Sequence, residues 1–176
     1  MACTEEGLNS MKSFRKAVMI LMLATIVAST GLQTDARRLA QAKSDPQTIA
    51  KLAQILERSG YTYKKAADNV WVANFKGDSL TDIHVIVTSA EGLIVMGVVV
   101  AEKSAMQVTP EMMRKLLKLT HEIDRVKIGF DNDDDLFVRA EVSARLFDLE
   151  EFKFDMQQVA AASDKVHAAI KPFVNR

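Results

Sequence analysis

The sequence predicts an α+β fold, in which an antiparallel five-stranded sheet packs against three helices. Three amphipathic helical patterns support this prediction, because each begins at a side chain that can cap a helix: Asp45, Thr109 and Asp148. Five runs of strand length, rich in valine and isoleucine, lie between the helices. The turns within each group of runs are short, and short connections join antiparallel strands. The predicted order is therefore helix, three strands, helix, two strands, helix.

The first predicted helix starts at Ser44 or Asp45 and ends at Gly60. Pro46 lies in its first turn, where proline is tolerated, and Gly60 is a typical residue after the last turn. Its apolar residues share one face at helical spacing: Ile49, Leu52, Ala53 and Leu56.

The five predicted strands are 69–76, 81–88, 93–101, 126–130 and 136–142. In the second of them, Ile83, Val85 and Val87 alternate with other residues and therefore share one face. The run 93–101 (LIVMGVVVA) is apolar on both faces, which is typical of a central strand.

The second predicted helix, which Thr109 and Pro110 open, carries two adjacent apolar stripes. Together they cover an arc of about 160°, wider than the roughly 100° that one core contact requires. Methionine is also frequent on adaptable binding surfaces, although core filling is the alternative interpretation. We therefore name six candidate partner-binding residues on this helix and on the central strand: Met112, Met113, Leu116, Leu117, Val98 and Val100.

The last predicted helix begins after Asp148, with Glu151 at the position of a capping box. Its apolar residues follow a seven-residue repeat that Ser163 interrupts. We expect residues 45–176 to form a single α+β domain.

Residues 1–36 read as a signal peptide region. Lys12, Arg15 and Lys16 precede an apolar run, 17–28, and small or polar residues follow it. The run is about 12 residues long, within the roughly 7–15 of a signal peptide and short of the roughly 20 that cross a bilayer. We expect translation to start at Met11, and residues 37–44 to form a polar tether.

This region predicts a periplasmic or secreted protein. An uncleaved signal that anchors the chain in the inner membrane is the alternative. The chain's single cysteine, Cys3, precedes the signal, so the exported part has no thiol for a disulfide, a zinc site or a nucleophile.

Composition excludes further classes of function. The net charge is zero, whereas nucleic-acid binding needs a basic surface. Glycines are few and scattered, and no serine nucleophile motif occurs, so we predict no enzyme activity and no cofactor.

The acidic run 131–135 is the sharpest candidate for a metal site. Asp131, Asp133 and Asp135 have the alternate spacing of a calcium-binding loop. The sixth and twelfth loop positions hold Leu136 and Val142 instead of glycine and glutamate. An acidic turn between two strands is the other interpretation.

The region from Asp45 to Phe173 resembles the YbjN family, whose domain is similar to the type III secretion chaperones. The resemblance rests on the strands VKIGF and LFVRAEV around DNDDD, the capped helix start DLEEF, the strand LIVMGVVV and the helix TPEMMRKLLKL. It implies a secretion-chaperone-like fold and a non-enzymatic, often dimeric, protein-binding domain, sometimes labelled a sensory transduction regulator.

From these observations we expect an exported, non-catalytic protein-binding domain with a chaperone-like or regulatory role. Its partner is another protein or a second copy in a homodimer, and it contacts a membrane only through an uncleaved signal. The competing hypothesis is a periplasmic or membrane-tethered sensor domain that binds a small ligand or calcium.

Overall fold

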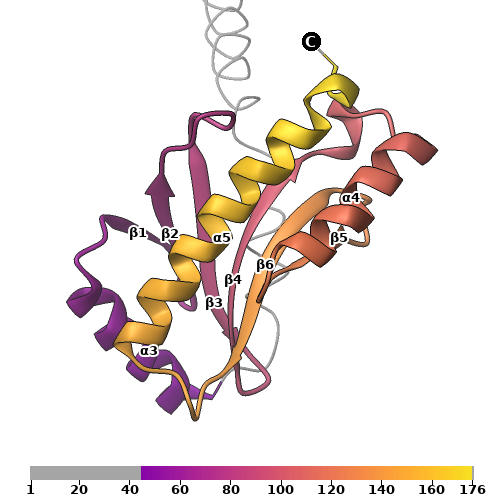
Figure 1. Cartoon of the computed structure of the whole chain (residues 1–176). Helices are drawn as coiled ribbons and strands as arrows, with labels where there is room; N and C mark the ends of the chain where they lie inside the picture. The colour runs from indigo at the N-terminus through magenta and orange to yellow at the C-terminus, as the bar shows by residue number, and fades with distance from the viewer. Residues whose placement is uncertain (1–44, 176) are drawn as a thin grey trace, which may run out of the picture. The chain divides into compact units, whose positions relative to one another are not determined.

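The computed structural model describes residues 45–175 (Figure 1). The predicted signal region and the polar tether therefore lie outside the described residues. In chain order the elements are α3 (Pro46–Ser59), β1 (Tyr63–Ala67), β2 (Val70–Phe75), β3 (Ile83–Ala90), β4 (Leu93–Ala101), the 3-10 turn η1 (Lys103–Ala105), α4 (Pro110–Glu122), β5 (Lys127–Phe130), β6 (Leu136–Ser143), α5 (Leu149–Ile170) and the 3-10 turn η2 (Lys171–Phe173).

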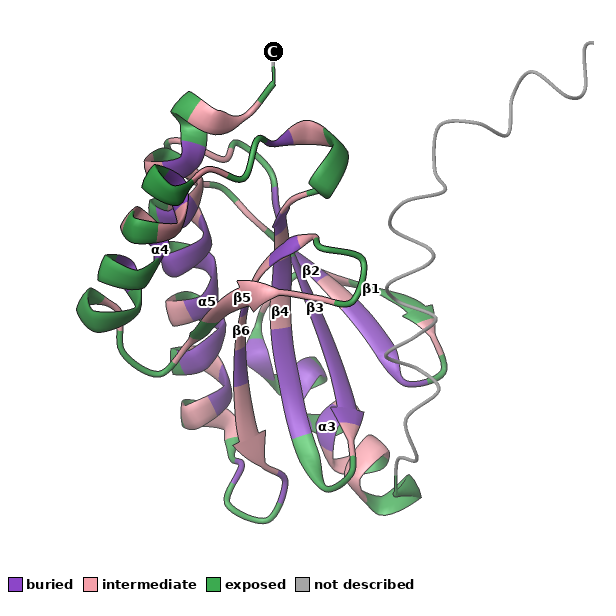
Figure 2. Ribbon diagram, turned by 90° about the vertical axis from the view of Figure 1, so that its right-hand side faces the viewer, coloured by how far each residue is buried: buried purple, intermediate pink, exposed green. Residues whose placement is uncertain are grey.

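The strands form one antiparallel sheet in the order β1-β2-β3-β4-β6-β5. The three helices lie on one face of this sheet (Figures 1 and 2). Helix α5 crosses β3, β4 and β6, while α3 and α4 pack on either side of it. The predicted α+β class and the order of the predicted elements are confirmed.

The prediction of five strands was wrong, because β1 is a sixth strand. Lys64 and Lys65 of β1 are exposed, and the register shifts between Lys65 and Ala67. The strand lies at the edge of the sheet, where charged residues and bulges prevent unwanted pairing. An edge strand with this composition lacks the apolar alternation by which the other strands were recognised.

Helix α3 begins and ends as predicted. The Asp45 carboxylate accepts the backbone N–H groups of Gln47 and Thr48, at 3.3 and 3.1 Å. Gly60 follows the helix at φ 79°, a left-handed conformation that glycine adopts without steric cost.

The core lies between the sheet and the helices. Ile83, Val85 and Val87 of β3 are at most 1% exposed, as their alternation predicts. Strand β4 lies between β3 and β6 and is therefore central, which confirms the interpretation of its apolar run.

Helix α5 runs along the middle of this core. The Asp148 carboxylate caps it by accepting the Glu151 N–H at 2.9 Å. Ser163, which interrupts the repeat, is fully buried and donates its hydroxyl to the Val159 carbonyl at 2.7 Å. None of the helices in the described part of the chain combines the length and the apolar composition that a membrane crossing requires.

Candidate protein-binding surface

Helix α4 carries the only predicted partner-binding residues that reach the surface of the described domain. The Thr109 hydroxyl accepts the Met112 N–H at 3.2 Å, and Pro110 fixes the first turn. Met112, Leu116 and Leu119 form the stripe of α4 that faces the core.

The structure separates the six candidate residues into two groups. Four are buried in the core: Met112 (0% exposed), Leu116 (4%), Val98 (3%) and Val100 (6%). Met113 is half-buried, and Leu117 is 66% exposed. A contact with a partner therefore stays a prediction for Met113 and Leu117, whereas the other four are occupied in core packing.

The second apolar stripe of α4 lies at the border of the core, because Met113 packs partly against the core while Leu117 is exposed. Val108, just before the cap, is 52% exposed and stands at the position that packs against Met113 in a hydrophobic staple. Leu117 follows Met113 by one helical turn. The exposed Arg114 and Lys118 flank Leu117, and we call these five residues the α4 outer surface.

Charge on α4 is unevenly distributed around the helix. Glu111 pairs with Lys115 at 3.6 Å, and Glu122 pairs with Lys165 of α5 at 3.0 Å. Within residues 45–175, no acidic group forms an ion pair with Arg114 or Lys118. The α4 outer surface is therefore apolar and basic.

An arginine joins the end of α4 to α5, and the sequence pattern gave no sign of it. Arg125 adopts φ 66°, pairs with Glu151, and lies 3.3 Å from Asp155. Its guanidinium also stacks 4.8 Å above the Phe154 ring. The contacts hold the α4–β5 connection against α5.

Asp155 is 1% exposed, and one of its carboxylate oxygens has no hydrogen-bond partner in the described structure. Burial raises the pKa of Asp155, the Arg125 guanidinium opposes part of the rise, and the Glu151 carboxylate adds to it. Burial therefore destabilises the charged form of Asp155, and the positive charge of Arg125 offsets part of that cost.

A second aspartate of α5 holds the connection between β2 and β3. One Asp164 oxygen accepts the backbone N–H groups of Ser79 and Leu80, both at 2.8 Å. The N–H of Leu80 is the main cause that lowers the pKa of Asp164, with smaller contributions from Ser79, Asp78 and His167 against partial desolvation. Here the charged form is the one that the fold stabilises.

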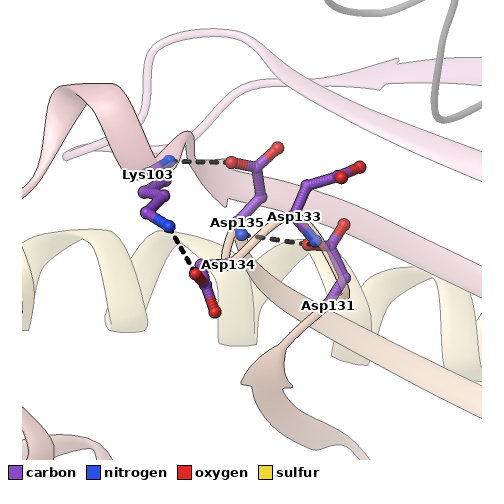
Figure 3. A network of polar contacts seen from close by, with 5 residues as sticks. All are labelled: Lys103, Asp131, Asp133, Asp134 and Asp135. Carbon is purple, nitrogen blue, oxygen red and sulfur yellow. Dashed lines mark hydrogen bonds and ion pairs between the residues drawn. The ribbon is translucent and has the colours of Figure 1, made fainter.

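The acidic run 131–135 forms a turn between β5 and β6 (Figure 3). Asp131 accepts the N–H groups of Asp133 and Asp135 at 2.9 and 3.0 Å. Asp135 in turn accepts the backbone N–H of Lys103 at 2.7 Å, and the Lys103 ammonium pairs with Asp134. Asp131 and Asp135 thus bind backbone groups.

The acidic run has the position of a turn between two strands, and a calcium site there stays a prediction. In the part of the chain that the structure describes, no group of three or more histidine, cysteine or acidic residues could hold a metal ion. Asp131, Asp133 and Asp135 are placed as the acidic-turn interpretation predicts.

A six-stranded antiparallel sheet with three helices on one face, in this order, is an α+β fold that solved structures share. Two solved structures share the fold at a TM-score of 0.50. One belongs to the heterodimeric ExoU–SpcU complex of the type III secretion system of Pseudomonas aeruginosa, with 14% identity over 68% of this chain and 97% of that chain. The other belongs to the ExsC–ExsE complex, with 14% identity over 70% of this chain and 93% of that chain.

YbjN from E. coli is also among the similar structures, at a TM-score of 0.49 and 16% identity over 72% of this chain and 94% of that chain. That score lies below 0.5, so the fold assignment rests on the two complexes. No family model and no curated protein sequence matches the chain. The secretion-chaperone-like fold predicted from the resemblance is confirmed.

Proposed function

We propose that the domain is a non-catalytic protein-binding module with a chaperone-like or regulatory role, and that it contacts its partner through the α4 outer surface. The observation that carries this proposal is the 66% exposure of Leu117 on a helix whose adjacent apolar stripe is buried in the core. Exposed apolar side chains that cluster on one face favour an interaction site.

The comparisons support the same role. Both solved structures at a TM-score of 0.50 come from protein–protein complexes, ExoU–SpcU and ExsC–ExsE. The contacts of three buried or partly buried aspartates support the non-catalytic part of the proposal, because each contact stabilises the fold. Asp131 and Asp164 accept backbone N–H groups, and Asp155 pairs with Arg125.

Site-directed photo-crosslinking in the source cells tests this proposal. A photoreactive phenylalanine analogue replaces Leu117 in the full chain, and the same analogue at the exposed Lys65 of β1 is the control. We expect Leu117 to yield one crosslinked protein of defined mass and Lys65 to yield none. Equal crosslinking from both positions, or none from either, contradicts the proposed surface.

We further propose that the protein acts outside the cytosol. The support is the order of basic, apolar and small residues in 12–36, which lie outside the described residues. Cell fractionation with mass spectrometry of the purified protein tests the proposal. A shortened chain in the periplasm or medium is expected, and a full-length chain in the cytosol contradicts it.

A further inference from the structure

The chemistry of the α4 outer surface specifies what kind of partner fits it. We propose that it binds an acidic amphipathic helical segment of another protein, rather than a second copy of this chain. This inference rests on the protein-binding role proposed above and adds the charge and shape of the ligand.

The apolar half of the surface fits a helix. Val108, Met113 and Leu117 form a line along α4, because Val108 and Met113 hold staple positions and Leu117 lies one turn further on. A partner helix meets such a line with its own apolar residues at every third or fourth position. Complete burial of a leucine strengthens binding by roughly tenfold to hundredfold.

The charged half of the surface selects an acidic partner. Arg114 and Lys118 are four residues apart, so both side chains lie on the same side of α4, next to Leu117. The acids of α4 do not neutralise them, since Glu111 and Glu122 are engaged by Lys115 and Lys165. Carboxylates on the partner would supply the missing negative charge.

The same charges disfavour a second copy on this surface. In a two-fold dimer, each copy presents the same patch to the other. An interface centred on Leu117 would therefore bring together two copies of Arg114 and two of Lys118 without any acid from the patch itself. Like charges that face each other across an interface weaken association, so a heterologous acidic segment is the better occupant.

Fluorescence anisotropy with two labelled synthetic peptides tests the inference on the full chain. Both peptides have about 18 residues and the same leucines at helical spacing, and their remaining positions carry glutamate in one and lysine in the other. We expect the acidic peptide to bind at least about tenfold more tightly than the basic one. Its advantage should shrink as salt is added.

Three variants test whether the α4 outer surface causes the preference for the acidic peptide. R114E/K118E is expected to reverse the preference, and Leu117→Ala to weaken binding of either peptide by about tenfold. R145E/K64E changes the net charge by the same amount at exposed sites in the β6–α5 connection and on β1, and should leave the preference as it is.

The inference is overturned by equal binding of the two peptides, by binding of neither, or by a preference that R114E/K118E does not change. It is also overturned if light scattering shows a dimer that Leu117→Glu dissociates. A natural partner that crosslinks at Leu117 equally in wild type and R114E/K118E would preserve the proposed function and overturn only the acidic-partner inference.

Discussion

Helices α4 and α5 pack on the same face of the sheet, but the fold uses their surfaces differently (Figure 2). Helix α5 lies between α3 and α4 and over three strands. It therefore buries even polar residues, Asp155 and Ser163, along with its apolar ones. Helix α4 lies toward the β5 side of the sheet and buries only Met112, Leu116 and Leu119.

Helix α5 therefore contributes most of its apolar surface to the core, whereas α4 keeps part of its apolar surface exposed. On α5 the one large exposed apolar side chain is Phe154, at 44%, and Arg125 stacks on its ring. On α4 Leu117 has the basic neighbours Arg114 and Lys118, and the described residues leave it 66% exposed. Substitutions on α5 should thus act on stability, and substitutions on the outer stripe of α4 on binding.

The largest expected effect tests this contrast directly. Phe152 of α5 is fully buried, with its ring 5.7 Å from the Phe147 ring and 6.2 Å from the Tyr61 ring. Phe152→Ala should lower the free energy of unfolding by about 3–5 kcal/mol, because it removes these contacts and leaves a cavity. Leu117→Ala should change it by no more than about 0.5 kcal/mol. Urea unfolding of both variants measures the difference, and similar losses would contradict the division between the two helices.

An intermediate effect is expected where the two helices are joined. Arg125→Ala leaves the buried Asp155 carboxylate without its cation and should reduce the free energy of unfolding by about 1–3 kcal/mol. Arg114→Ala removes the same charge from the α4 outer surface and should have an effect below about 0.5 kcal/mol. Thermal unfolding of the pair, with Arg125→Lys as the variant that keeps the charge, provides the measurement. Equal free energies of unfolding for the two alanine variants would show that the Arg125–Asp155 ion pair does not stabilise the fold.

The sequence predicts those parts of the fold that local chemistry determines. Caps at Asp45, Thr109 and Asp148 and the alternation in β3 are readable because they depend on neighbouring residues alone. Strand β1 was missed because its lysines serve edge protection instead of core packing.

The candidate site could be predicted only in outline. The wide apolar arc of α4 indicates a second surface, but tertiary packing decides which stripe enters the core, and this left Leu117 outside and Leu116 inside. The ion pair between Arg125 and Asp155 joins residues 30 positions apart, since 155 − 125 = 30, and neither residue belongs to a recognisable motif. Such a contact follows from the packing of α4 against α5.

The smallest expected effect distinguishes two aspartates within α5 by the sign of their pH dependence. The pKa of Asp155 is raised by burial, so the folded chain keeps its proton at a pH where the unfolded chain has lost it. Stability should therefore fall as pH rises from about 4, the unfolded value, through the folded pKa. The pKa of Asp164 is lowered by backbone N–H groups, so its contribution is present above about pH 4 and is lost as pH falls toward the folded pKa.

Asparagine variants separate the two titrations, because each keeps the size of the side chain and removes its proton equilibrium. Asp155→Asn should flatten the decline on the high-pH side, and Asp164→Asn should flatten the loss on the low-pH side while its Oδ1 still accepts both N–H groups. Each slope is bounded by about 1.4 kcal/mol per pH unit, the limit for one proton. Urea unfolding from about pH 3 to 7 measures both limbs. A change in the free energy of unfolding in the same pH range for both variants would contradict the opposite pKa shifts of Asp155 and Asp164.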